Sequence, residues 1–426
     1  MTAPSSPSTF TTSAARAPAG GIEAPAREVT LADNARTTLH FPLLAGSQNA
    51  VGKFSVSAQS PEFSLTRQFE ITVRPAWPAV RRSQAQQLDG AQTLSFGPSL
   101  FDGLFAESGI AQLSIASIPP LPFTTAIDGL IGYPYGCIEQ TTSRLWPLVD
   151  LDAATSRKFG QEPLEEAKRK DMLDTGFGRI AAMQRQNGQF SFWPGEDSPM
   201  PQMTAYVADI LITAKQNGIA IPETVLEKAL TRLNDDLLTG GDGYYSYDHS
   251  QHLRFASNAY GGYVLARVNR APLGTLRSLW DNQRDRSLTA LPLVHLGIAL
   301  KLAGDEKRAD AAIATALEMT SERPGYLGDY GSDVRDEALL LALLYEHGLA
   351  SQATGGRVMK LARELRRPEM SRYWFSTQER LAVFRLGRAV LSENHGGLQG
   401  EFRIAGTPHA LSGRPLVSRE VGLEDL

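Results

Sequence analysis

Apolar and polar residues alternate along the first part of the chain with the period of two that is typical of β-strands. The apolar members of these runs are Val29, Leu31, Leu39, Phe41 and Leu43, then Phe54, Val56 and Ala58, and then Leu65, Phe69, Ile71 and Val73. Gly, Pro and Asn separate the runs, as in antiparallel sheets with one buried face. The pattern predicts strands of a β-sandwich over 28–82, although a complete sandwich has about seven strands and this segment holds fewer.

The segments around this sandwich follow other patterns. Residues 1–27 are rich in Ser, Thr, Ala, Pro and Gly, which predicts a disordered stretch or a linker. Alternating patterns predict further short strands over 92–96 and 111–118, and another over 400–404. Between them, the stretch 122–130 is predicted only to lead the chain away from the sheet.

From about residue 141 to residue 391, apolar residues recur at helical spacing, as Leu339, Leu340, Leu343 and Leu344 illustrate. The predicted helices span 161–183, 204–217, 222–238, 258–268, 273–284, 288–302, 306–320, 333–347, 350–365 and 377–391. Short joints that contain Gly or Pro separate them. This organisation is typical of repeated αα-hairpins that close into a ring or a solenoid, although the sequence itself shows no clean period.

Composition narrows the function classes only slightly. The 426 residues are enough for two to four domains, and the net charge is −4. Neither a nucleic acid nor a membrane surface is therefore favoured by charge. No apolar run approaches the roughly 18 residues of a membrane span, and the N-terminus lacks the apolar core of a signal peptide. One cysteine fits either the cytosol or a periplasmic protein that has no use for disulfides.

The single cysteine stands in the run Tyr133-Pro134-Tyr135-Gly136-Cys137-Ile138-Glu139-Gln140. A lone cysteine is most often a buried apolar thiol. Here Gln140 follows at a spacing that puts its side chain on the same face of a helical turn as Cys137. Attack of the Cys137 thiolate on Gln140 Cδ, with loss of ammonia, would close an internal thioester ring. Glu139 would assist the proton transfers, and Gly136 would allow a tight turn before the ring.

This run, continued by Thr141-Thr142-Ser143, resembles the thioester motif of bacterial alpha-2-macroglobulins. Three further segments are similar to landmarks of the same family, namely 183–193 (Met-Gln-Arg-Gln-Asn-Gly-Gln-Phe-Ser-Phe-Trp), 204–207 (Thr-Ala-Tyr-Val) and 376–379 (Ser-Thr-Gln-Glu). The resemblance implies a thioester between Cys137 and Gln140. It also implies that Tyr133 and Tyr135 match the aromatic pair that shields this bond.

The resemblance covers nearly all of this chain but only a middle part of a family member, and it implies a multidomain fold. Residues 121–393 would form an α/α toroid of repeated αα-hairpins, the thioester domain. This toroid would be inserted into a CUB-like β-sandwich, whose first strands lie in 84–120 and whose returning strands begin in 396–426. A partial macroglobulin-like β-sandwich would precede it over 28–82.

The function implied is that of a broad-spectrum endopeptidase inhibitor, which traps proteases and acylates their lysines through the thioester. Such chemistry is spent in one turnover, so the protein is expected not to be an enzyme, and it needs no cofactor or metal. The expected partners are target proteases, the remaining macroglobulin domains and a penicillin-binding protein. The resemblance also implies a periplasmic protein, anchored to the inner membrane as a lipoprotein, with its export signal upstream of Met1.

Two histidines offer alternative chemistry. His249 and His252 lie in a Tyr-rich stretch, but a zinc site needs three or four ligands and none stands at motif spacing. In some complement relatives, a histidine about this far beyond the thioester takes over the acyl group. Spacing alone does not assign that role, so exposed loop histidines are the main expectation.

A second function class is an α/α-toroid enzyme of the terpenoid-cyclase or lyase type. Residues 186–193 are similar to the Gln-, Gly- and Trp-containing repeats of those enzymes. They need clustered aspartates for acid catalysis or for magnesium diphosphate. The only adjacent pair is Asp235-Asp236, which is expected to be a solvated helix face, and Phe190 and Trp193 are expected to be core aromatics. The thioester class is therefore favoured.

Overall fold

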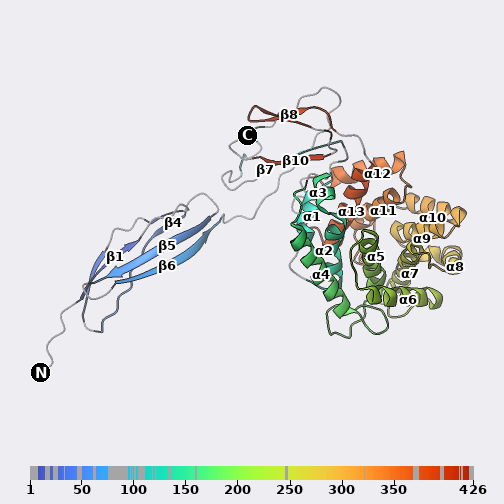
Figure 1. Ribbon diagram of the computed structural model, residues 1–426, viewed down its shortest axis with the longest axis horizontal. Coiled ribbons are helices and arrows are strands. Elements are labelled where there is room, and N and C mark those ends of the chain that lie inside the picture. Colours follow the sequence, from blue (N-terminus) through green and yellow to red (C-terminus); the bar gives the residue numbers. More distant parts are fainter. Residues whose placement is uncertain are drawn as a thin grey trace.

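The computed structural model shows a sheet at the N-terminal end and a large helical domain (Figure 1). The structure describes residues 8–14, 20–22, 27–32, 34–45, 50–60, 64–74, 95, 97, 99, 102–103, 111–117, 119, 121–132, 136–158, 161–244, 248–320, 322–367, 374–393, 398–411, 413 and 416–421. Within these residues, no helix is both long and apolar enough to cross a membrane.

The N-terminal sheet is antiparallel and has the strand order β3-β1-β5-β6. Its strands are β1 (Ser8–Ala14), β3 (Arg27–Leu31), β5 (Ala50–Gln59) and β6 (Ser64–Val73), and a separate short pair consists of β2 (Gly20–Ile22) and β4 (Leu43–Ala45). The alternating runs thus form strands as predicted, except that Leu39 and Phe41 lie in irregular structure.

The expectation that residues 1–27 lack structure is wrong for 8–14 and 20–22, the part of this stretch before residue 27 that the structure describes. Strand β1 lies within them and pairs with β3 on one side and β5 on the other. Its sequence, Ser-Thr-Phe-Thr-Thr-Ser-Ala, contains three threonines, a residue type that is enriched in strands. A composition of small polar residues therefore concealed a strand whose backbone is satisfied by long-range pairing.

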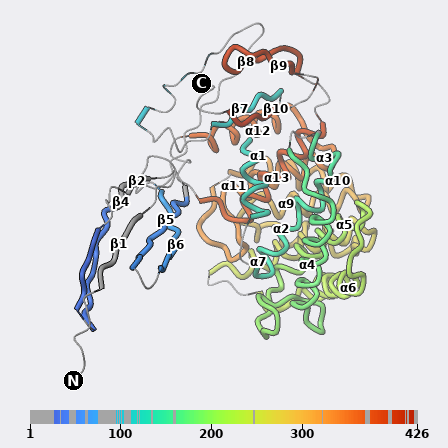
Figure 2. Tube along the Cα trace, turned by 60° about the vertical axis from the view of Figure 1, so that its left-hand side comes forward, coloured from blue at the N-terminus to red at the C-terminus, as the bar shows by residue number. Residues whose placement is uncertain are grey.

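Six helices form the inner ring of the helical domain. Figure 2 shows the helical domain from another side. The six helices are α2 (Ile138–Asp150), α5 (Gln202–Gln216), α7 (Ser250–Arg267), α9 (Ala290–Leu302), α11 (Asp333–Glu346) and α13 (Thr377–Glu393). Each contacts the next in this order, and α13 contacts α2, which closes the ring. Residues 290–300 of α9 are all buried, because this helix is surrounded by neighbours. The closed ring confirms an α/α toroid.

Further helices cover the inner ring from outside. They are α1 (Phe123–Ile131), α4 (Glu166–Met183), α6 (Glu223–Thr239), α8 (Leu273–Gln283), α10 (Glu306–Glu318) and α12 (Gln352–Glu364), and each contacts at least one inner helix. The short α3 (Ala153–Lys158) and the 3-10 turn η3 (Arg284–Arg286) lie between them in the chain. Outer helices bury a single stripe, for example Ala309, Ala312 and Ala316 of α10.

Most predicted helices agree with the structure to within a few residues, but α1, α2 and α3 were not among the predicted ranges, and α7 begins earlier than predicted. No helix was predicted over α1, whose Thr, Ile and Gly are weak helix formers. Packing holds it instead, because Phe123 stacks on Phe384 at 5.6 Å and a Cβ at Gly387 would lie 2.5 Å from the Phe123 ring. Helix α7 begins at Ser250 rather than at residue 258, which matters for His252 below.

Strands also flank the helical domain in the sequence. Strand β7 (Ala111–Ala116) pairs antiparallel with β10 (Leu416–Val421) along its whole length. Strand β8 (Glu401–Ile404), which was predicted, forms a hairpin with β9 (Thr407–Ala410), which was not. The strand predicted over 92–96 lies outside the described residues apart from Ser95, which is irregular. The helical domain is therefore bracketed by two strands that meet in one sheet.

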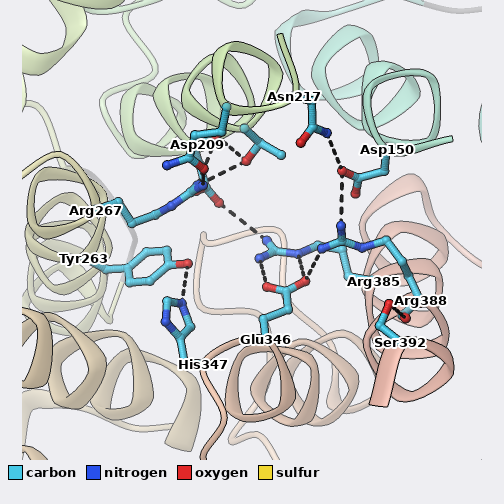
Figure 3. A network of polar contacts seen from close by, with 12 residues as sticks. Asp150, Asp209, Asn217, Tyr263, Arg267, Glu346, His347, Arg385, Arg388 and Ser392 are labelled. Carbon is cyan, nitrogen blue, oxygen red and sulfur yellow. Dashed lines mark hydrogen bonds and ion pairs between the residues drawn. The ribbon is translucent and has the colours of Figure 1, made fainter. Parts of the chain in front are cut away.

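Buried ion pairs join the inner helices at one end of the ring (Figure 3). Arg385 lies 2.6 Å from Glu346 and 3.4 Å from Asp209, while Arg388 lies 3.0 Å from Glu346 and 3.3 Å from Asp150. Burial raises the pKa of Glu346, but the charges and hydrogen bonds of Arg385 and Arg388 outweigh it and bring that pKa to about 2. The network thus pins α2, α5, α11 and α13 with charges that are all compensated.

We expect Glu346→Gln to destabilise the protein in a pH-dependent way. The folded pKa of Glu346 lies below its usual 4.5, so its stabilisation is present above pH 4.5 and is lost as the pH falls toward 2. At neutral pH the variant removes the carboxylate that Arg385 and Arg388 share and leaves them only Asp209 and Asp150, so we expect a cost of about 3 kcal/mol of unfolding free energy. The free energy of unfolding, measured by urea titration of both proteins at several pH values, checks this expectation.

The matched control is Glu227→Gln, because Glu227 pairs with Arg270 on the surface, where both side chains are about half exposed. Its loss costs at most about 1 kcal/mol. A difference between wild type and Glu346→Gln that stays constant from neutral to acid pH would contradict the assignment.

Candidate functional site

Cys137 is the N-cap of helix α2, and its backbone is extended. Its Sγ accepts a hydrogen bond from the Gln140 backbone N–H at 3.4 Å, and its own backbone N–H donates to Gln140 Oε1 at 3.3 Å. This reciprocal arrangement is a capping box, in which Cys replaces the usual Ser or Thr. The thiol sulfur and the side-chain amide are therefore held within one helical turn.

The turn before α2 is fixed from two sides. The Gly136 carbonyl accepts a hydrogen bond from Arg179 Nε of α4 at 2.8 Å, and the Ile138 N–H donates to the Phe192 carbonyl at 3.1 Å. A Cβ at Gly136 would lie 3.0 Å from Arg179 Nε, so glycine suits this close approach. Tyr133 and Tyr135 lie outside the described residues, and their shielding role stays a prediction.

Glu139 is buried directly behind this turn, with 4% of its surface exposed. Ser143 Oγ donates to its carboxylate at 2.5 Å, Thr377 Oγ1 lies 2.7 Å from Oε2, and Gln378 Nε2 donates at 2.9 Å. The Tyr206 hydroxyl, 2.7 Å from Ser143 Oγ, completes the set as a donor to Ser143. No ion pair among the described residues involves Glu139, so neutral donors alone satisfy its carboxylate.

Helix ends support this buried carboxylate as well. Glu139 lies in the first turn of α2, and Thr377 is the first residue of α13. The N-terminus of a helix carries partial positive charge, which favours a carboxylate beside it. Two helix N-termini therefore face Glu139.

The electrostatics around Cys137 keep the free thiol protonated. Burial raises the pKa of the Cys137 thiol, the negative charge of Glu139 raises it further, and hydrogen bonds from the Gln140 and Glu139 backbone N–H groups oppose these effects. Cys137 is a free thiol in the structure, with 3% of its surface exposed. A protonated, dry thiol is protected from oxidation and needs a base before it attacks.

Sequence reasoning assigned no role to Tyr206, Thr377 or Gln378. They stand in two of the similar segments, and the third, residues 183–193, supplies the Phe192 carbonyl. All these segments meet at the start of α2, although they come from α5, α13 and a bridged loop. In the sequence these residues are marked only by their polar side chains. In the structure Thr377 and Gln378 are nevertheless both buried.

The two histidines considered as alternative candidates lie at the start of α7. The expectation of exposed loop histidines is wrong for His252, which is buried in α7 and accepts a hydrogen bond from the Leu288 N–H at 3.1 Å. Burial lowers the pKa of His252 to about 4. His249 occupies the N-cap position of α7 without a side-chain capping hydrogen bond, and it is half-buried. Across the described residues, no cluster of three or more His, Cys, Asp or Glu suits a metal ion.

Two further expectations need correction. Asp236 is buried against Arg232, at 2.8 Å, because α6 turns this side chain inward, so only Asp235 lies on a solvated face. Phe190 is fully buried, as expected, but Trp193 is half-buried and meets Phe192 edge-on at 5.4 Å between ring centres.

Comparisons with known proteins agree on one family. The family model described as "A-macroglobulin TED domain" matches residues 114–380. The chain is similar to "Alpha-2-macroglobulin" of Xylella fastidiosa (strain Temecula1 / ATCC 700964), with 42% identity over 92% of this chain and 24% of that protein. The chain thus spans about a quarter of the length of this curated relative.

Solved structures give the same result. Native alpha-2-macroglobulin from Escherichia coli, from domain MG7 to the C-terminus, matches with a TM-score of 0.75 and 30% identity, over 99% of this chain and 66% of that chain. Salmonella alpha-2-macroglobulin reacted with methylamine matches with a TM-score of 0.72 and 31% identity, over 98% of this chain and 27% of that one.

We expect Thr377→Val to destabilise the folded chain because it removes a donor from the buried Glu139 carboxylate. The loss is about 1.5–3 kcal/mol, the range for hydrogen bonds to charged groups. Thr231→Val is the control, since the Thr231 hydroxyl bonds only to the Glu227 carbonyl on an exposed helix face. Urea unfolding of both variants measures the difference, and equal small effects would show that Thr377 does not support Glu139.

Proposed function

Because the chain belongs to the alpha-2-macroglobulin family, we propose that it is part of a bacterial endopeptidase inhibitor that reacts through a Cys137–Gln140 thioester. The observation that carries the proposal is the reciprocal capping of Cys137 and Gln140 in a buried turn. The two hydrogen bonds place the nucleophile and the acyl group together without any other residue between them. The whole inhibitor is larger than this chain, which spans about a quarter of its curated relative.

Thioester formation needs one bond made and one broken. The Cys137 sulfur attacks Gln140 Cδ as its proton leaves, the C–N bond of the amide breaks, and the nitrogen departs as ammonia. Glu139 is the nearest carboxylate in the sequence, and its charge acts on the Cys137 thiol. We assign it the proton transfers from the thiol toward the leaving nitrogen.

The thioester opens when an amine displaces the Cys137 sulfur. An amine, such as a lysine of a trapped protease, attacks Gln140 Cδ, an amide bond forms, and Cys137 leaves as a thiol. Thiols ionise near pH 8.5, far more readily than amines lose a proton, so the thioester is the better acyl donor. The chain is consumed in one turnover, so the protein acts as a suicide inhibitor and not as an enzyme.

Such a bond survives only where water is excluded. Cys137 is almost completely buried, which supports a dry site. We assign further shielding to Tyr133 and Tyr135, because aromatic rings cover large apolar areas. In the whole protein, cleavage by a protease would move domains and uncover the thioester.

The same proposal extends to the parts around the toroid. The pairing of β7 with β10 supports insertion of the helical domain into a CUB-like sandwich, and the strands of 27–73 support a partial macroglobulin-like sandwich. By family resemblance, the whole protein is a periplasmic lipoprotein that meets proteases and a penicillin-binding protein. The terpenoid-cyclase alternative is not favoured, because Asp236 is paired with Arg232.

We expect Cys137→Ala and Gln140→Ala each to abolish the incorporation of labelled methylamine. The intact mass of the wild-type chain should be lower than that of its sequence by one ammonia, and methylamine should then add to it. Gln352→Ala, at an exposed position of α12, is the control and should label like wild type. Undiminished labelling of either site variant would contradict the thioester.

The shielding role proposed for Tyr133 and Tyr135 can be tested separately. If Tyr133 and Tyr135 shield the bond, alanine at either position leaves the toroid folded and speeds the release of thiol by water. If they are core residues instead, the same changes cost about 3–5 kcal/mol of stability. Thiol release and thermal midpoint, measured on the same samples, distinguish the two.

A further inference from the structure

The peptide unit between Gly136 and Cys137 is hydrogen-bonded at both of its polar atoms. Its carbonyl oxygen accepts a hydrogen bond from Arg179 Nε of α4 at 2.8 Å, and its N–H donates to Gln140 Oε1 at 3.3 Å. This peptide is trans, so the carbonyl and the N–H point in opposite directions. Arg179, on one side of the chain, therefore aims the Cys137 N–H at the acyl oxygen on the other side.

The peptide unit after Cys137 is fixed as well. The Ile138 N–H donates to the Phe192 carbonyl at 3.1 Å, and the Cys137 carbonyl accepts a hydrogen bond from the Thr141 N–H at 2.9 Å. Both peptide planes that flank the Cys137 Cα thus have a partner at each end. The Cys137 N–H has little freedom to turn away from Gln140 as long as these partners hold.

The Arg179 guanidinium packs closely against Gly136, although Arg179 is an exposed residue of α4. A Cβ at Gly136 would lie 3.0 Å from Arg179 Nε and 3.2 Å from its Cζ. A cationic donor makes a stronger hydrogen bond to a carbonyl than a neutral one, and hydrogen bonds in a chain polarise one another. The charge of Arg179 therefore makes the Cys137 N–H a stronger donor to Gln140 Oε1.

Gln140 Oε1 is the atom on which charge develops in the proposed reactions. When the Cys137 sulfur or an amine bonds to Gln140 Cδ, the carbonyl electron pair moves onto Oε1, and it returns as the C–N or the C–S bond breaks. The thiol proton goes to the departing nitrogen, or the amine proton to the departing sulfur. A donor that is already aimed at such an oxygen stabilises the transition state. Catalytic hydrogen bonds are often long at rest and tighten during the reaction, which fits the 3.3 Å observed here.

We propose that the Cys137 N–H is the oxyanion donor of the thioester site and that Arg179 is the positioning residue that directs and polarises it. The inference rests on the proposed function and deepens it, because it assigns a donor to the acyl oxygen during the reaction. Two hydrogen bonds on one trans peptide carry it. Arg179 acts through this peptide and not on the reacting atoms.

The first experiment follows the chemistry of the acyl group. Arg179→Met should slow methylamine incorporation, per molecule that carries the thioester, at least about fivefold, which is less than the ~10²–10³-fold for deleting a direct oxyanion donor because the donor remains. Arg179→Lys keeps a cationic donor and should recover part of the rate. Lys170→Met is the matched control, because it removes an equal charge from an exposed position of the same helix. Thermal midpoints close to that of wild type verify folding.

A purely structural role of Arg179 predicts the opposite sign. If its loss only loosened the turn, water and amines would reach the bond more easily, and thiol release would accelerate. Alkylation of Cys137 by iodoacetamide, measured in a Gln140→Ala background, does not involve the acyl oxygen and should therefore be unchanged by Arg179→Met. Faster or unchanged aminolysis, or alkylation that accelerates when Arg179 is lost, would overturn the proposal.

The second experiment needs no thioester. Cys137 is the only cysteine, so labelling with ¹⁵N-cysteine gives one backbone amide signal in an NMR spectrum. Arg179→Met should move its proton signal to higher field and speed its exchange with water, because the hydrogen bond to Gln140 weakens, whereas Lys170→Met should do neither. An unmoved signal would overturn the orienting role. If the wild-type mass lacks the deficit of one ammonia but the signal follows Arg179, the proposed function and the oxyanion role fail, and only the orientation of the N–H stands.

Discussion

The buried carboxylate of Glu139 is the constraint on which the site depends. A carboxylate without a cationic partner is costly to bury unless its oxygens are hydrogen-bonded. Here Ser143 comes from the same helix, whereas Thr377 and Gln378 come from α13, the last helix of the ring. Because α13 meets α2 at the closing seam, the step that completes the toroid also satisfies Glu139. Closure of the ring and assembly of the site are one event.

The candidate site lies at the starts of its helices, and the charge network of Figure 3 includes the last residues of other inner helices and of α2. Cys137 and Thr377 stand at the starts of their helices, where neutral donors and helix N-termini surround them. Asp150, Arg267 and Glu346 are the last residues of theirs, and they belong to the network of full charges in Figure 3. The network of Figure 3 therefore lies at the helix ends away from the reactive turn, whereas a second set of buried ion pairs, around Asp329, lies before the start of α11.

The sequence predicts what is local and misses what depends on closure. Cys137 and Gln140 could be paired in advance because one helical turn joins them, and long apolar stripes revealed most helices. Strand β1 and helix α1 were missed because pairing and packing, not propensity, hold them. His252 was misplaced because the polar stretch before it concealed the start of α7. Thr377 carried no signal, because only the closed ring brings it to Glu139.

The proposed thioester depends on more than the capping pair of Cys137 and Gln140. The capping pair needs only the first turn of α2, so a short peptide could bring sulfur and amide together. It could not keep water away or hold a buried base, because those come from α13 and from the turn that bonds to Phe192 and Arg179. Isolated short helices are also only marginally formed in water. We therefore expect the proposed thioester to form and persist only in the closed toroid.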